Sequence, residues 1–367
     1  MPRISIKPFA DSLREYEGWL RTQLEGDLWE DDLEEKHQKM RDSAFVFLRA
    51  TYWRWAEAIL TICPDLADAP VVFGVGDIHL ENYGVWRDGE GRLVWGVNDF
   101  DEAAQMPYIV DVVRLATSAV LSTRGQRRGS KQICADVLDG YRQGLAKPRP
   151  FSLDERHPWL RRLFVVTEDE RGKFWKKMNK LDADDSIPAR YRAAIERQLP
   201  GDDAALEKFA RRHGAGTGSL GRPRWVGVAK WRGGRLVREA KAIVPSGWTV
   251  AHPGSRRRSA APVVAGRYRA PDPWYLVHGS TVVRRLSPNS RKIEVQDHPQ
   301  QLVDDDMLQA MGYELANVHL GTANVGTRIE EDLDKRGARW LERSTAIAAE
   351  FVAKEFKQFA RARGSTS

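Results

Sequence analysis

Short apolar runs mark the region from residue 71 to residue 103. One run, Val71 to Val75, ends at Gly-Asp, and a second, Leu93 to Val97, ends at Asn-Asp-Phe-Asp. Between them, Asp88-Gly89-Glu90-Gly91 is typical of a tight turn. The pattern predicts a β-hairpin-like unit that brings two acidic clusters to the same end.

Apolar residues at helical spacing predict helices on both sides of this region. Residues 11–34 are charged and mostly helical, and residues 151–212 are charged and helical in pieces separated by prolines. The clearer helices are predicted over residues 35–62, 106–124, 130–146 and 304–320, and one long or two shorter helices over 328–363.

A different pattern starts at residue 213. Residues 225–231 and 235–244 alternate apolar and polar positions and are separated by Gly233-Gly234, a good two-residue hairpin turn. Two shorter strands are predicted within 274–286, and residues 292–295 are a candidate for another. This part predicts a small antiparallel sheet, interrupted by a flexible basic loop over 252–270.

Composition narrows the class of protein. The chain has 367 residues, which favours two lobes over one core. It has no apolar run of transmembrane length and no apolar segment near the N-terminus that would predict a signal peptide, so we expect a cytoplasmic protein. Cys63 and Cys134 lie in apolar helical contexts and are predicted to be buried free thiols. The net charge of +7 favours an anionic ligand such as a nucleotide and permits nucleic acid, although scattered charge is typical of an ordinary solvated surface.

Polar side chains follow both apolar runs. Asp77, His79 and Asn82 follow the first, and Asp99 and Asp101 follow the second. Asp77 precedes Asn82 at the spacing of a kinase catalytic loop, where the aspartate accepts a hydroxyl proton and the asparagine binds Mg²⁺. Asp99, before a phenylalanine, then corresponds to the aspartate that holds Mg²⁺ between phosphates. A hairpin with a salt-bridged surface would also use such residues, and His79 alone could be a core histidine.

A second motif lies before the predicted sheet. Residues 216–221 fit G-x-G-x-x-G, with Gly216, Gly218 and Gly221 as the glycines and Ser219 among them. A helix is predicted before this segment and strands after it, which argues against a dinucleotide-binding loop and favours a kinase-type glycine loop whose backbone N–H groups approach phosphates. A flexible turn between lobes is the alternative.

Lys241 stands on the predicted strand after the Gly-Gly turn, where a kinase places the lysine that pairs with the α- and β-phosphates. No glutamate occurs between Glu239 and Glu294, so the usual carboxylate partner of this lysine is absent or comes from elsewhere. We expect the Lys241 and Asp99 side-chain tips to meet across one cleft, roughly 3–10 Å apart.

Gly76-Asp-Ile-His-Leu-Glu-Asn82 with Asn98-Asp-Phe-Asp101 resembles the catalytic loop of aminoglycoside phosphotransferases and other protein-kinase-like enzymes. Over residues 38–325 the chain more closely resembles a large bacterial family catalogued as a domain of unknown function and regarded as kinase-like. Two departures stand out: the phosphotransferases usually carry histidine where this chain has Val75, and the family tends to place glutamate where it has Ala242.

The resemblance also implies a changed chain order. Residues 313–320 resemble the helix that normally precedes the catalytic loop, and moving residues 213–325 ahead of residue 35 restores the usual order. The implied fold is therefore α+β, bilobal, protein-kinase-like and circularly permuted. Its parts are an N-terminal helical arm (1–34), a helical catalytic lobe (35–212), a small β lobe with the glycine loop (213–300) and C-terminal helices completing the helical lobe (301–367).

These motifs together predict a phosphotransferase that uses ATP or GTP with Mg²⁺ and acts on a hydroxyl acceptor, a small molecule rather than a protein. Asp77 is the predicted base and His79 braces the loop; Asn82, Asp99 and Asp101 are predicted Mg²⁺ ligands; Gly216, Gly218, Ser219, Gly221 and Lys241 hold the phosphates. Three alternatives stay open: a metal-dependent phosphoesterase, a nucleotidyl transferase, and a non-catalytic pseudokinase that binds nucleotide or nucleic acid. The sequence identifies neither the acceptor nor the oligomeric state.

Overall fold

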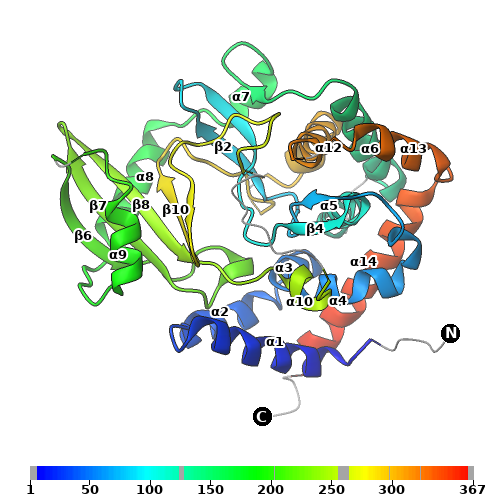
Figure 1. Cartoon of the computed structure of the whole chain (residues 1–367), viewed down its shortest axis with the longest axis horizontal. Helices are drawn as coiled ribbons and strands as arrows, with labels where there is room; N and C mark the ends of the chain where they lie inside the picture. The colour runs from blue at the N-terminus through cyan, green and yellow to red at the C-terminus, as the bar shows by residue number, and fades with distance from the viewer. Residues whose placement is uncertain are drawn as a thin grey trace.

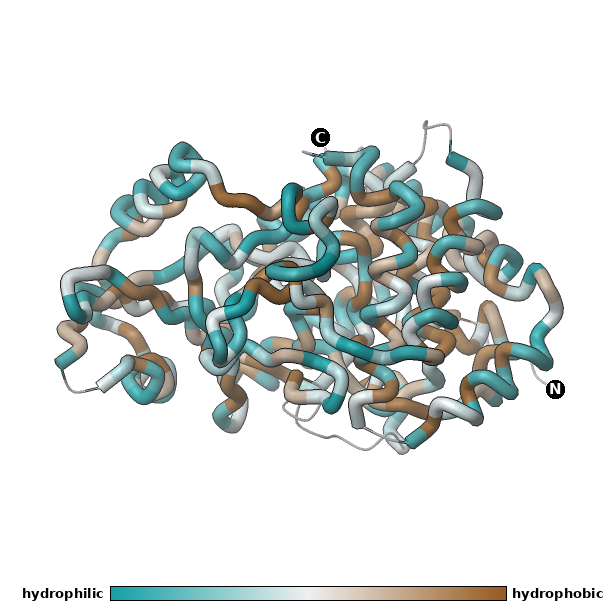
Figure 2. Tube along the Cα trace, turned by 90° about the horizontal axis from the view of Figure 1, so that it is seen from above, coloured by the Kyte–Doolittle hydropathy of each residue, from teal (hydrophilic) through white to brown (hydrophobic). Residues whose placement is uncertain are grey.

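A computed structural model of the chain describes residues 6–123, 128–201, 203–254, 264–296, 298–322 and 324–362. The architecture is α+β, with a five-stranded sheet on one side and most of the helices on the other (Figure 1). In Figure 2, apolar segments run through the middle of the helical part, and polar residues form most of its outline. Within the described residues, no helix has both the length and the apolar character needed to span a bilayer.

The described helices fall in most of the stretches predicted to be helical, and the one over residues 247–251 was not predicted. They are α1 (Phe9–Leu24), α2 (Glu30–Lys39), α3 (Ala44–Ala50), α4 (Tyr52–Ile62), α5 (Tyr108–Ser122), α6 (Ser130–Ala146), α7 (Pro158–Leu163), α8 (Glu168–Asn179), α9 (Ala189–Glu196), α10 (Gly247–Ala251), α12 (Asp305–Leu320), α13 (Gly326–Lys335) and α14 (Trp340–Arg361). The single helix predicted over 35–62 is wrong, because three helices occupy that stretch. Ser43 starts α3 by accepting the Val46 N–H, and Thr51 leaves the helical conformation between α3 and α4.

The five-stranded sheet is a small antiparallel sheet, as predicted. Its strands are β6 (Ala205–Arg211), β7 (Arg224–Trp231), β8 (Gly234–Ala242), β10 (Thr281–Leu286) and β9 (Leu276–His278), in that spatial order. Strand β6 falls within residues 151–212, so the prediction that this stretch is helical is wrong at its end. Residues 292–295 form no strand and contribute one isolated bridge, Gly84 with Lys292. Part of the predicted basic loop, residues 255–263, lies outside the described residues.

The predicted hairpin pairs different strands from those expected. Strand β1 (Val71–Gly74) pairs with β4 (Ala104–Pro107), and the Asp88–Gly91 turn instead joins β2 (Tyr83–Arg87) to β3 (Leu93–Val97), which also pairs with β5 (Phe151–Ser152). Strand β2 begins directly after the polar loop, and Gly84 interrupts its apolar pattern. The sequence pattern therefore did not predict this strand. The polar loops that follow β1 and β3 nevertheless lie together.

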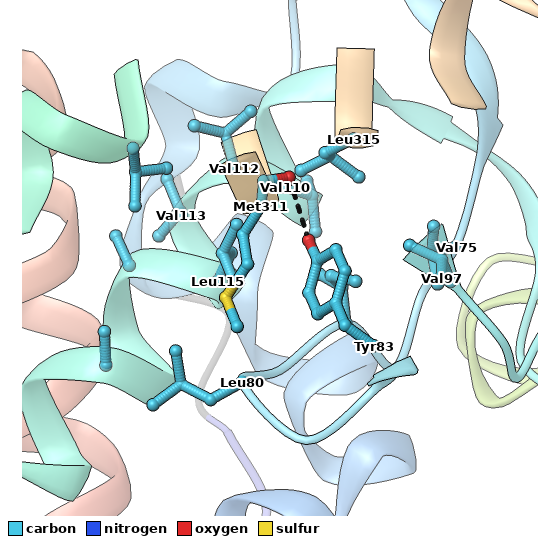
Figure 3. Close-up of a cluster of buried hydrophobic side chains, with 14 of the residues drawn as sticks. Val75, Leu80, Tyr83, Val97, Val110, Val112, Val113, Leu115, Met311 and Leu315 are labelled. Atoms are coloured by element: carbon cyan, nitrogen blue, oxygen red, sulfur yellow. Dashed lines mark hydrogen bonds between the residues drawn. The ribbon is translucent and has the colours of Figure 1, made fainter. Parts of the chain in front are cut away.

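Helix α5 fixes the position of these loops. It is almost completely buried, and Figure 3 shows Val110, Val112, Val113 and Leu115 of α5 in one cluster with Met311 and Leu315 of α12. Tyr83 joins this cluster and donates its hydroxyl proton to the Met311 carbonyl, 3.0 Å away. Helices α6 and α12 pack backbone to backbone, since a side chain at Gly140 or Gly312 would collide with the facing helix. Cys63 and Cys134 are buried free thiols, as predicted.

Candidate active site

The loop that carries Asp77 is held from below by α5. The Asp111 carboxylate accepts the backbone N–H groups of Val75 and Gly76 at 2.6 and 3.0 Å, and it lies 3.2 Å from His319 Nε2 on α12. Asp111 and His319 therefore brace the loop from which the expected histidine is missing. Gly76 has a φ of +79°, and a side chain there would collide with the backbone of the loop after Asp99, so glycine is required.

Asp77 pairs with a buried arginine of α5. Arg114 has a fully buried side chain, forms an ion pair with Asp77, and donates to the Leu48 carbonyl at 2.9 Å. Its guanidinium also lies 5.0 Å from the centre of the Tyr52 ring. Asp111 and Arg114 lie one turn apart on α5, a spacing that favours an ion pair, but each has its partner in the loop instead. Burial raises the pKa of Asp77 above its ordinary value, against the opposing charge of Arg114.

Asn82 joins the two predicted acidic clusters. Its Nδ2 donates to the carbonyls of Asp77 and Asp99, both at 3.0 Å, and its Oδ1 accepts the Asp99 N–H at 3.1 Å. One side-chain amide thus binds both loops. Its oxygen already has one donor, so Asn82 acts first as a structural link between Asp77 and Asp99.

His79 is a neutral, buried histidine. Its Nδ1 accepts the Glu81 N–H at 3.1 Å, which places the ring proton on Nε2. Burial, together with the positive charges of Arg49 and Lys292, holds the His79 pKa well below its usual range. This environment fits the predicted bracing role.

Lys241 reaches the loop after β3 from the sheet. Its Nζ lies 3.3 Å from Asp99 Oδ2 and forms a second ion pair with Asp101, and the residue is 2% exposed. The predicted proximity of Lys241 and Asp99 is confirmed. Among the described residues, the carboxylate partners of Lys241 are these two aspartates, and they take the place of the glutamate that a kinase supplies from a helix. Burial alone would raise the pKa of Asp99, but Lys241 and Lys292 outweigh it and hold that pKa well below the ordinary value, whereas burial and the neighbouring Asp99 raise the pKa of Asp101.

The glycine loop connects β6 to β7. The helix predicted before it is wrong, but the strands on both sides fit the expected strand–loop–strand context. The loop is held at Gly218, whose carbonyl accepts the Lys36 ammonium at 3.0 Å, and at Ser219, whose hydroxyl accepts Arg224 at 2.7 Å. A Cβ placed on Gly218 would lie 3.1 Å from Asp77 Oδ2. The loop therefore reaches the predicted base. Helix α2, which carries Lys36, covers the loop, and no local pattern predicted this contact.

Two adjoining compartments open between the sheet and these loops. The larger has a volume of about 620 Å³, within the range of small-molecule sites. Among the described residues its cations are Lys39, Arg49, Lys177, Arg212, Arg224, Arg284 and Lys292, and its acids are Asp42, Glu81, Asp99 and Glu294. The smaller, about 70 Å³, contains Asp77 and shares Arg49, Asp99, Gly216, Thr217 and Lys292 with the larger. Lys241 lines neither, because Asp99 and Asp101 stand in front of it.

Three of these cations form a cluster missed by the sequence analysis. Arg212, Arg224 and Arg284 all donate to Glu239, a fully buried carboxylate on β8. Burial would raise the pKa of Glu239, but the three guanidinium groups hold it well below its ordinary value. Charged residues at inward positions of the predicted strands were the available signal, since Glu239 lies opposite Arg284 in the register.

Asp99 and Asp101 are oxygen donors that line the smaller compartment, and Asp99 also lines the larger. Within the described residues, no group of three or more His, Cys, Asp or Glu side chains is arranged to hold a metal ion. Mg²⁺ is usually bound through one or two carboxylates together with waters and substrate phosphates. Asp99 and Asp101 therefore fit a Mg²⁺ ion that binds together with a phosphate ligand.

Comparison with known proteins shows a likeness to a bacterial family. A family model described as "Uncharacterized protein conserved in bacteria (DUF2252)" matches residues 29–178. This stretch contains Asp77, Asn82 and Asp99 and ends before the glycine loop and Lys241. The match supports the predicted similarity to an uncharacterised bacterial family, over a shorter stretch than residues 38–325. No curated protein and no solved structure matches the chain.

Proposed function

We propose that this chain is a Mg²⁺-dependent phosphotransferase that transfers the terminal phosphoryl group of ATP or GTP to a hydroxyl group of a small molecule. The observation that carries the proposal is the contact of Lys241 with Asp99 and Asp101, next to Asp77 and under the glycine loop. The Asp77 loop, the Asp99 loop and the glycine loop thus line one pocket, with Lys241 directly behind the aspartates, and each has a part in phosphoryl transfer.

In this proposal Asp77 is the base. It faces the smaller compartment, which Tyr16, Tyr52 and Trp53 also line, so the hydroxyl group of the acceptor enters from this side. The acceptor hydroxyl oxygen attacks the terminal phosphorus, its proton passes to Asp77, and the bond from phosphorus to the bridging oxygen breaks to release the nucleoside diphosphate. Arg114 positions the Asp77 carboxylate, and the raised pKa that burial gives Asp77 suits a proton acceptor.

The donor occupies the larger compartment. Asp99 and Asp101 would hold Mg²⁺, with Asn82 fixing the loop that carries them. Bound there, Mg²⁺ would neutralise charge on the phosphate oxygens. The backbone of the glycine loop and the cations of the cavity supply the remaining positive potential, and preorganised groups of this kind account for most of the catalysis of phosphoryl transfer.

The fold we propose is a circularly permuted protein-kinase-like fold. In support, the sheet with the glycine loop and Lys241 lies against the loops of Asp77 and Asp99, although it follows them in the sequence. Helices α1 and α14, which flank the rearranged segments, also touch, with the Phe9 and Phe359 ring centroids 5.6 Å apart. A chain joined in the other order needs these flanks to be close.

The test uses ATP labelled at either phosphate. The protein, Mg²⁺ and fractionated bacterial metabolites are incubated with ATP labelled at the γ- or the α-phosphate, with Asp77→Asn as the inactive control. Label passing to an acceptor from the γ-position alone supports the proposal. Transfer from the α-position would make the protein a nucleotidyl transferase, phosphate release from phosphoesters without nucleotide would make it a phosphoesterase, and nucleotide binding without transfer would make it a pseudokinase.

A further inference from the structure

The larger compartment has more charged lining residues than is usual for a site that binds a nucleobase. Eleven of its twenty lining residues are charged, and four are apolar: Phe45, Val46, Ala215 and Val295. Sites that hold a planar base are lined mostly by apolar and aromatic side chains. A nearby apolar cavity beside Trp86 and Tyr275 has a volume of about 80 Å³, far below the roughly 300 Å³ at the lower end of ligand sites.

The positive charge of the compartment exceeds what its own carboxylates balance. Glu239 balances one of the three arginines that surround it, leaving two positive charges on the cluster. Within the described part of the chain, Arg284 binds Glu239 through Nε alone. Its two terminal nitrogens can therefore bind a ligand. Among the described residues, no carboxylate lies within 4.0 Å of the Lys292 ammonium, and Lys292 is exposed in the cavity.

We propose that this compartment recognises the donor by its polyphosphate chain and does not select the nucleobase, so that ATP, GTP and inorganic tripolyphosphate are all ligands. This inference rests on the proposed function and names its donor class. Arg212, Arg284 and Lys292 contact the phosphates. Arg224, which holds Ser219, positions the glycine loop, and Lys241, which stands behind Asp99, positions the aspartates.

Competition measures this selectivity directly. Labelled ATP is held at equilibrium with the protein and Mg²⁺ in a dialysis cell and displaced by unlabelled ATP, GTP, inorganic tripolyphosphate or adenosine. We expect the first three to displace it with dissociation constants within about tenfold of one another, and adenosine to fail at concentrations about a hundredfold higher. Displacement by adenosine, or tripolyphosphate binding about a hundredfold weaker than ATP, would overturn the inference.

Variants identify the groups that contact the phosphates. Lys292→Gln removes an exposed charge with no ion-pair partner among the described residues, so it leaves the fold intact. The variant is expected to weaken the binding of ATP and of tripolyphosphate by the same factor, about tenfold or more, because each ligand loses a hydrogen bond to a charged group. Arg291→Gln is the matched control, because Arg291 points away to Glu170 and the Val165 carbonyl; its affinities should stay within about twofold of wild type.

Arg284→Gln gives a second, independent variant, with its folding checked by thermal unfolding because Glu239 loses a partner. The inference fails if the Lys292 and Arg284 variants both bind tripolyphosphate as the wild type does. It also fails, with the proposed function intact, if ATP binds and is used while tripolyphosphate does not compete. Tripolyphosphate binding without any phosphoryl transfer from ATP would retain the inference and contradict the proposed function, and binding of neither ligand would contradict both.

Discussion

Lys241 Nζ lies 3.3 Å from Asp99 Oδ2, although 142 positions separate the two residues in the chain. The lysine belongs to β8 of the five-stranded sheet, and the aspartate follows β3 in the helical part. The contact means that two motifs with no local connection form one site. It also gives the lysine a role in the ligand-free protein, since its charge balances Asp99 and Asp101.

Removing this charge should destabilise the protein in a way that Mg²⁺ reverses. Lys241→Met removes the cation closest to Asp99 and Asp101, which are partly buried, and leaves Asp101 with the more distant Arg222. The variant should therefore lose at most the roughly 3–5 kcal/mol of unfolding free energy that breaking a buried ion pair costs. Mg²⁺ should therefore raise the unfolding temperature of the variant more than that of the wild type. Lys230→Met, which removes an exposed lysine of β7 that pairs with Glu207 of β6, is the control and should change stability little. A variant that unfolds like the wild type, with or without Mg²⁺, would contradict this role for Lys241.

Asp77→Asn separates transfer from binding. The base contacts the acceptor hydroxyl, so transfer should fall by roughly 10²–10⁴-fold while nucleotide affinity stays within about threefold. The variant is compared with Asp139→Asn, an exposed position on α6 away from the site. Calorimetry and the labelled transfer assay together check the prediction. A parallel loss of nucleotide binding would instead make Asp77 a metal ligand.

The buried Lys36 should give a pH-dependent stability. Burial lowers its pKa from 10.5 to about 8, so below pH 8 the folded protein carries a charged, buried lysine. Between pH 8 and 10.5 the folded state has released this proton and the unfolded state keeps it, so this group makes unfolding harder as pH rises through that window. The full effect of the lowered pKa is roughly 3 kcal/mol.

Lys36→Met tests this relationship. The variant should be more stable than the wild type at pH 7, and the difference should shrink by pH 10, as measured by urea unfolding at both pH values. It should also bind nucleotide more weakly, because the glycine loop loses a contact that holds it in place. An equal stability difference at both pH values would mean that Lys36 does not titrate in this range.

The sequence predicted those features that depend on neighbouring residues. Helices α5, α6 and α12 follow from apolar residues at helical spacing, and the β7–β8 hairpin follows from alternation around Gly233-Gly234. The spacing of Asp77, Asn82 and Asp99 was also local, and Asn82 does link the other two.

Features that depend on distant pairing were missed. Charged Glu207 and Lys208 interrupt the pattern of β6, which becomes a strand because β7 pairs with it. Asp111 and Arg114 stand one turn apart, but each has its partner in the loop that carries Asp77. The arginines around Glu239, and Lys36 over the glycine loop, meet only after the sheet has folded against α2 and the helical part.

The most direct test of the central claim is a calorimetric titration of ATP and GTP into the wild type and Asp99→Asn, each with and without Mg²⁺. Asp99 is ionised and faces the cavity, so it should couple nucleotide binding to the metal. The account predicts that the wild type binds nucleotide more tightly with Mg²⁺ and that Asp99→Asn loses this dependence. Binding of neither nucleotide by the wild type near millimolar concentration, or equal binding with and without Mg²⁺, would contradict it.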